Sequence, residues 1–158
     1  MPNVYAILGA ADTHKSSTVR ALTGVSQWQS AWNVATPTHP ALDFHVEVVS
    51  LQESNISPEG FVERINAVNL NRASLKFPNV ANILIPLRIT GINGLRDGAV
   101  YLQHFISVGW NIMPIVIFGA AVLPTGLPAG VRTLSIFGSA SMAANGIASQ
   151  IRPFWNWL

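Results

Sequence analysis

The sequence predicts a single α/β domain over residues 1–158, with three layers and a mostly parallel five-stranded sheet between helices. Three observations lead to this fold class. Five apolar segments of strand length recur along the chain, and most are followed by a helical pattern. The most apolar stretch, residues 108–122, centres on the β-branched run 115–117, which favours a fully buried parallel strand. The chain is also long enough to bury one core of this kind.

The five strands are expected at residues 4–8, 44–51, 80–87, 112–118 and 134–137. In the second strand, apolar residues alternate with Asp43, His45 and Glu47. This alternation predicts that one side of the strand is exposed and that the strand lies at an edge of the sheet. The third strand contains the wholly apolar run 83–85 and is therefore expected to be central.

Helices are expected over about residues 16–22, from Ser57 onward, over 94–108 and over 141–151. The helix at Ser57 has the best start signals, a capping serine followed by proline and glutamate. With right-handed crossovers, the simplest spatial order of the strands is second, first, third, fourth, fifth. That order places a ligand-binding crevice outside the carboxyl end of the first strand.

The composition excludes some classes of protein and favours others. Apolar residues make up 49% of the chain, charged residues only 10%, and the net charge is +2. So little charge indicates a surface that is partly covered in a homo-oligomer or by a protein partner. The basic residues form no cluster, so nucleic-acid binding is not expected. No membrane span is expected, because Asn111 and Pro114 interrupt the apolar stretch, and the lack of a secretory signal makes the cytoplasm the default location.

A phosphate-binding motif follows the first strand. The chain matches the P-loop pattern G-x-x-x-x-G-K-[ST] at Gly9, Lys15 and Ser16. In such a motif, backbone N–H groups and the positive end of the helix hold phosphate oxygens, the lysine neutralises the outer phosphates and the hydroxyl binds magnesium. The expected phosphate-binding residues are Gly9, Asp12, Thr13, His14, Lys15, Ser16 and Ser17.

The wider run of residues 15–24, KSSTVRALTG, resembles the start of P-loop GTPases. The resemblance implies a P-loop NTPase-like strand order, with a flavodoxin-like order as the alternative. It also implies binding of ATP or GTP with Mg²⁺, and slow hydrolysis or phosphoryl transfer with Lys15 as the charge clamp. His14 departs from the pattern because it replaces the glycine before the lysine, where a side chain is expected to crowd the phosphates.

Three further residues are candidates for the same site. Glu53 follows the second strand and could position magnesium or water, Thr36 lies in a long loop and could contact the metal, and Arg88 ends the third strand and could contact a phosphate. A solvated charge, a turn residue and a surface ion pair are their alternative roles. The metal-binding D-x-x-G motif is missing after the second strand, and residues 119–122 lack the guanine-reading N-K-x-D.

Two other functions are compatible with the sequence. A non-catalytic pseudo-NTPase, acting as an oligomeric interaction or scaffold protein, would explain His14, the missing acidic motifs and the low charge. A binder of another phosphate ligand, with flavodoxin-like topology, would need only the loop and the helix end. The aromatic tail, residues 154–157, is expected to pack either on its own domain or on a second subunit.

Overall fold

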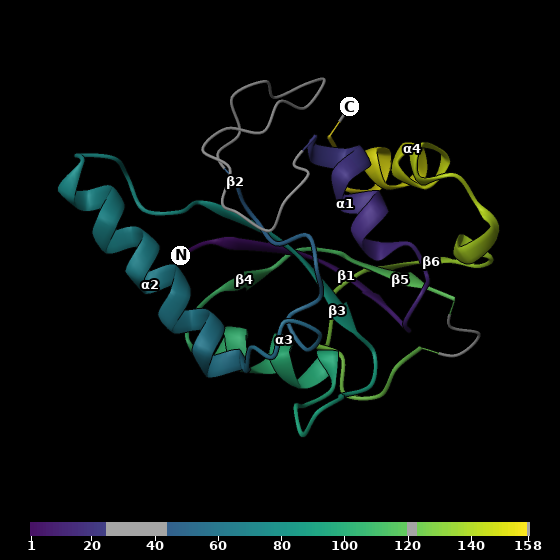
Figure 1. The fold of residues 1–158 in the computed structure, drawn as a ribbon, viewed down its shortest axis with the longest axis horizontal. Helices are drawn as coiled ribbons and strands as arrows, with labels where there is room; N and C mark the ends of the chain where they lie inside the picture. Colours follow the sequence, from purple (N-terminus) through teal and green to yellow (C-terminus); the bar gives the residue numbers. More distant parts are fainter. Residues whose placement is uncertain (25–43, 120–122, 158) are drawn as a thin grey trace.

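A computed structural model describes residues 1–24, 44–119 and 123–157. These residues form a parallel sheet with helices on both faces, which confirms the predicted α/β fold class (Figure 1). The strands are β1 (Asn3–Gly9), β2 (Phe44–Val46), β3 (Asn82–Arg88), β4 (Asn111–Ile112), β5 (Ile115–Phe118) and β6 (Thr133–Ile136). The helices are α1 (Lys15–Thr23), α2 (Pro58–Ser74), α3 (Gly98–Ser107) and α4 (Ala144–Phe154), with a short 3₁₀ helix η1 (Ser139–Ser141) before α4.

The spatial order of the sheet is β2-β3-β1-β5-β6, and β4 also pairs with β1. As predicted, β2 lies at the edge, but its neighbour is β3 rather than β1. The predicted order, in which the first strand lies between the second and the third, is therefore wrong, and the flavodoxin-like order is excluded. Strand and helix patterns do not fix this order, because a right-handed crossover can lead to the next strand or pass over one position.

The predicted fourth strand is present but divided into two parts. Both β4 and β5 pair with β1, near its two ends. Met113 and Pro114 separate them, and proline has no N–H group to donate to a sheet. The apolar stretch is thus a buried parallel strand, as expected. In the described part of the chain, no helix is both long enough and apolar enough to cross a membrane.

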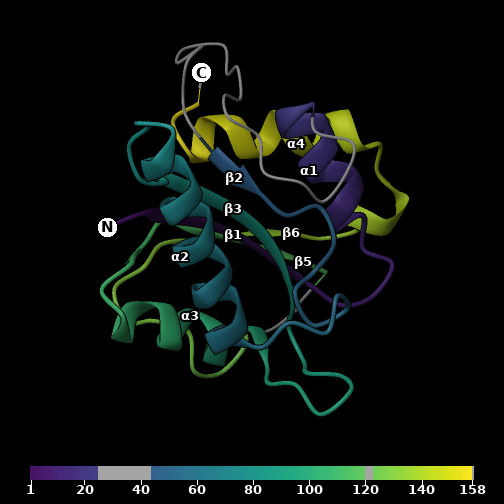
Figure 2. The ribbon, with the colours of Figure 1, turned by 60° about the vertical axis from the view of Figure 1, so that its left-hand side comes forward.

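Two pairs of helices cover the two faces of the sheet. Figure 2 shows α1 and α4 on one side of it and α2 and α3 on the other. Side chains of β1 alternate between the two cores: Val4, Ala6 and Leu8 belong to the core under α2 and α3, whereas Tyr5 and Ile7 belong to the core under α1 and α4. Because both faces are covered, the residues in the middle of the central strands β1 and β3 are apolar and buried.

The helix boundaries follow their sequence signals only in part. Ser57 caps α2 as predicted, with its Oγ accepting a 3.0 Å hydrogen bond from the N–H of Gly60. Gly24 ends α1 in the left-handed conformation, also as predicted. In contrast, α3 begins only at Gly98, and α4 begins and ends later than the expected range 141–151.

The polar side of β2 is buried, contrary to the prediction. His45 and Glu47 are only 4% and 2% exposed. The Nε2 atom of His45 lies 2.6 Å from one carboxylate oxygen of Glu47, and the other oxygen accepts a 2.5 Å hydrogen bond from Arg64 of α2. The His45 ring also packs edge-on against Phe61. α2 therefore covers this side of the edge strand, and paired charges allow its burial. Asp43 lies outside the described residues.

The aromatic tail packs on its own sheet. Trp155 and Trp157 both make edge-to-face contacts with Tyr5 of β1, and Trp157 also contacts Phe44 of β2. The indole Nε1 of Trp155 donates a 2.7 Å hydrogen bond to the carbonyl oxygen of Pro114. Of the two expected locations, the structure thus shows the first, and these tryptophans complete the core under α1 and α4.

Candidate functional site

The predicted phosphate-binding residues lie at the end of β1, in the loop that follows it and in the first turn of α1. Thr13 Oγ1 donates a 2.8 Å hydrogen bond to the carbonyl oxygen of Ala10, which fixes the shape of the loop. Asp12 and His14 have φ angles of 58° and 69°, in the left-handed region. Glycine adopts this conformation without strain, whereas a residue with a Cβ atom does so at a cost of roughly 1–3 kcal/mol.

Gly9 is the residue that lets the loop turn back over the end of β1. A Cβ atom at this position would lie 2.5 Å from Thr13 Oγ1 and 3.1 Å from the Cβ atom of Phe118. The first distance is shorter than any ordinary contact between these atoms. The match of Gly9 to the motif therefore has a steric reason in this fold.

The orientation of the His14 ring is set by the segment before α4. Its Nδ1 atom lies 3.1 Å from the carbonyl oxygen of Met142. Because a carbonyl oxygen only accepts hydrogen bonds, Nδ1 is the donor of this hydrogen bond. His14 thus ties the loop to the chain between η1 and α4.

Lys15 is the first residue of α1 and is only 6% exposed. Its ammonium group donates a 2.6 Å hydrogen bond to the carbonyl oxygen of Ala10. Burial lowers the pKa of Lys15, while the carboxylate of Glu53 raises it and the charge of Arg88 lowers it. An ammonium group has three donors, so an anion entering the site can accept those that Ala10 does not use.

A polar cavity of about 300 Å³ lies at the start of α1. It is lined by Asp12, Thr13, His14, Lys15, Ser16, Ser17, Val49, Ser50 and Glu53. The structure thus brings Glu53 together with the predicted loop residues, whereas Gly9 shapes the loop without lining the cavity. Thr36 lies outside the described residues. A cavity at the start of a helix, with a buried lysine and three serines, suits an anion.

Arg88 reaches the same region from β3. The sheet register pairs Arg88 with Gly9, which places the end of β3 beside the start of the loop. Its Nη1 atom lies 3.8 Å from a carboxylate oxygen of Glu53. The Nε atom of Arg88 is buried and has no hydrogen-bond partner among the described residues. Two cations and one carboxylate therefore meet here, and we call them the Lys15–Glu53–Arg88 cluster.

Gln52 is a structural residue of the site that sequence reasoning missed. It is fully buried. Its side-chain oxygen accepts a 3.0 Å hydrogen bond from the backbone N–H of Arg88, and its side-chain nitrogen donates one of 3.0 Å to the carbonyl oxygen of Arg88 and one of 3.4 Å to that of Arg96. The Gln52 amide thus fastens the chain before Glu53 to the end of β3. A glutamine after a strand gives no sequence signal for such a role.

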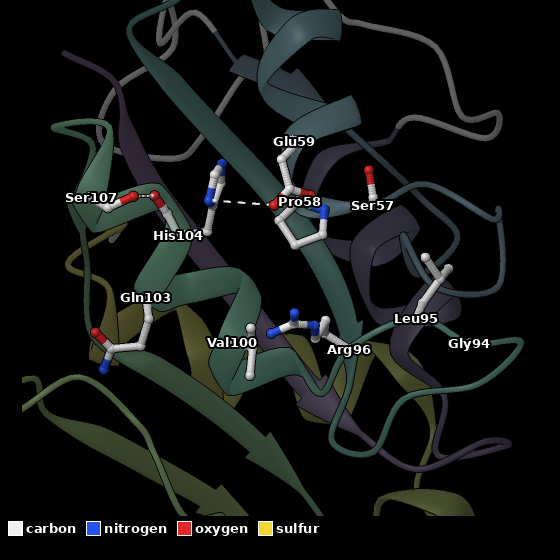
Figure 3. Close-up of a pocket in the computed structure, with 10 residues that line it drawn as sticks. All are labelled: Ser57, Pro58, Glu59, Gly94, Leu95, Arg96, Val100, Gln103, His104 and Ser107. Atoms are coloured by element: carbon white, nitrogen blue, oxygen red, sulfur yellow. Dashed lines mark hydrogen bonds and ion pairs between the residues drawn. The ribbon is translucent and has the colours of Figure 1, made fainter.

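A second cavity, of about 470 Å³, lies between the start of α2 and α3 (Figure 3). The His104 ring is directed toward Glu59, and its Nδ1 atom lies 3.8 Å from the carboxylate. Arg96 extends into the same region from the loop before α3, toward Val100. Glu59 and Arg96 are both exposed, so this cavity is a surface depression without a buried polar centre.

The segment Ser139–Ser141 after β6 forms the 3₁₀ helix η1. Residues 120–122, where a guanine-reading motif was sought, lie outside the described residues. Within the ranges 1–24, 44–119 and 123–157, no three histidine, aspartate or glutamate side chains gather closely enough to hold a metal ion.

No protein-family model matches the sequence, and no curated protein or solved structure matches it significantly.

Proposed function

We propose that the chain binds the phosphate groups of a nucleoside triphosphate, ATP or GTP, in the cavity at the start of α1. The observation that carries this proposal is the burial of the Lys15 ammonium group in the first turn of a helix, beside a loop of left-handed residues. A buried cation without a full set of acceptors is costly, and a phosphate oxygen would supply the missing ones. The helix end favours the same negative charge.

The roles of the other residues follow from their positions around the cavity. Ser16 and Ser17 line it together with Lys15, and their hydroxyls and backbone N–H groups would bind phosphate oxygens. Ser16 is the candidate ligand for a magnesium ion that accompanies the nucleotide, although the proposal does not require the ion. The strand order is compatible with the P-loop NTPase class that the motif resembles.

Slow hydrolysis is the second part of the proposal. The cavity contains the carboxylates of Asp12 and Glu53, and Glu53 faces Arg88. A carboxylate engaged by an arginine is less available to position a water molecule. Turnover is therefore expected to be slow in the isolated chain.

The test is titration calorimetry with ATP, GTP and inorganic triphosphate, in the presence of magnesium. The wild type is compared with Lys15→Ala, with His14→Gly and with Lys76→Ala, which removes the other lysine of the chain, an exposed one. Loss of binding in Lys15→Ala alone would support the proposal. Binding only in His14→Gly would identify a motif disabled at one position. Silence in all four proteins would contradict nucleotide binding and favour an interaction or scaffold protein.

A further inference from the structure

We propose that phosphate binding at this site needs no divalent metal, because Arg88 supplies a second cation and Glu53 is an internal counter-ion that the phosphate displaces. The inference rests on the proposed phosphate binding and concerns how the charge of the ligand is neutralised. Three observations support it: β3 ends in Arg88, Gln52 holds the backbone of Arg88, and the side chain of Glu53 is partly exposed.

The strand next to the motif, β3, ends in Arg88. In P-loop NTPases, magnesium is held by the serine or threonine of the loop and by an acidic residue from elsewhere in the fold. The strands that flank β1 end beside the loop, at Arg88 in β3 and at Phe118 in β5. Neither residue is acidic, and Gly119 follows Phe118. The strand end that is paired with Gly9 thus carries a cation rather than a carboxylate.

The side chain of Gln52 holds the backbone of Arg88 in the absence of any ligand. It binds both the N–H and the carbonyl oxygen of Arg88. The Arg88 side chain is 20% exposed, and its Nε atom is buried without a hydrogen-bond partner among the described residues. A guanidinium group has five donors in a planar fork that matches the oxygens of a phosphate. Arg88 thus offers an unused Nε donor and a positive charge that acts on Lys15.

Glu53 forms only a loose ion pair with Arg88. Its carboxylate is 3.8 Å from Nη1 of Arg88, which is longer than a hydrogen bond, and its side chain is 35% exposed. Such a loose and partly solvated pair contributes little to stability. The carboxylate also acts on Lys15, so its single charge is shared between the two cations of the cluster. A phosphate carries more charge than one carboxylate, and Glu53 can turn toward solvent when the phosphate enters.

The two possible roles of Glu53 make opposite predictions. If Glu53 positions magnesium or water, removing its charge weakens binding of the nucleotide and makes magnesium less effective. If Glu53 is the internal counter-ion, removing its charge strengthens binding in the absence of magnesium, because the phosphate no longer competes with it.

The experiment is titration calorimetry with ATP and with inorganic triphosphate, in buffers containing either magnesium or EDTA. The wild type is expected to bind in EDTA as well as in magnesium. In EDTA, Arg88→Gln should weaken binding about tenfold to a hundredfold, as expected for lost hydrogen bonds to a charged group. Glu53→Gln should strengthen it about two- to fivefold. Arg96→Gln removes the same charge from an exposed position in the second cavity and should leave the affinity within about twofold.

Arg88→Lys keeps the positive charge and serves as a second variant if Arg88→Gln does not fold. In EDTA, Arg88→Lys should bind the triphosphate more tightly than Arg88→Gln. If Arg88→Gln cannot be tested, Arg88→Lys should still show measurable binding. Binding by the wild type in magnesium but not in EDTA, or weaker binding in Glu53→Gln, would overturn the metal-free inference and leave phosphate binding intact. Binding of neither ligand in either buffer would overturn the proposed function, and the inference with it.

Discussion

The ammonium group of Lys15 and the carbonyl oxygen of Ala10 are joined by a 2.6 Å hydrogen bond across the loop that begins α1. This bond holds a nearly buried cation at the edge of a polar cavity. Glu53 reaches the same cation from the chain after β2. The electrostatics of the site therefore depend on residues far apart in the sequence, and they can be measured at Lys15 itself.

Replacing Glu53 with glutamine should lower the pKa of Lys15. The carboxylate of Glu53 raises this pKa, against the lowering effect of burial and of Arg88. The chain has only two lysines, so NMR of lysine labelled with ¹³C at the ε carbon gives one signal for each. Lys76 is exposed and serves as the internal control, with an unchanged titration. An unchanged or raised pKa of Lys15 would show that Glu53 does not act on it.

The buried lysine should make the stability of the fold depend on alkaline pH. Burial lowers the pKa of Lys15 below its ordinary value of 10.5. Between the two values the unfolded chain binds more protons than the folded chain, so the free energy of unfolding rises with pH in that window. Lys15→Met lacks this group. Urea unfolding at several pH values should therefore show the wild type gaining stability relative to Lys15→Met as the pH rises toward 10.5, and a constant difference would contradict the burial.

Gly9→Ala should destabilise the protein by about 1–3 kcal/mol and abolish phosphate binding. The Cβ atom that this substitution adds would lie 2.5 Å from Thr13 Oγ1, so the loop would have to move. Gly146→Ala is the matched control, because nothing lies within 4 Å of a Cβ at that position inside α4. That variant should be more stable by about 0.5–1 kcal/mol. Equal effects of the two changes on the free energy of unfolding would count against the tight turn at Gly9.

Gln52→Leu should cost about 1–3 kcal/mol, since it leaves the backbone N–H and carbonyl oxygen of Arg88 without their partner. Gln103→Leu is the control. Gln103 is exposed and makes one hydrogen bond, of 3.1 Å, to the carbonyl oxygen of Gly126. Its loss should change stability by no more than about 0.5 kcal/mol. Urea unfolding measures both, and a small effect at Gln52 would show that its amide is not needed to hold β3.

Glu47→Ala should destabilise the protein by about 3 kcal/mol, because the buried His45 loses its partner and Arg64 loses a short ion pair. Glu63→Ala removes an exposed carboxylate from α2 and should have an effect within about 0.5 kcal/mol. Thermal and urea unfolding report both changes. Similar values for the two variants would mean that the polar side of β2 is solvated after all.

Several elements could be predicted because their signals are local. A capping serine followed by proline identified the start of α2, and the spacing of Gly9, Lys15 and Ser16 after a strand identified the loop at α1. Runs of β-branched residues identified the buried strands. In each case, the physical cause lies within a few residues along the chain, as it does for helix caps and apolar periods.

Other features depend on contacts between distant segments. The alternating pattern of β2 correctly placed it at an edge, but only the packing of α2 decided that His45 and Glu47 are buried. Likewise, Gln52 has no motif, and its role exists only because its amide meets the backbone of Arg88.

The sequence by itself determined the α/β class and the place of the loop that leads from β1 to Lys15 at the start of α1. The tertiary structure alone decided that β3, and not β2, lies beside β1, so that Arg88 ends next to Gly9 and faces Glu53 across the site. The reason is physical. Apolar patterns specify which faces are buried, but each crossover has more than one allowed landing position, and the packing of the whole sheet selects between them.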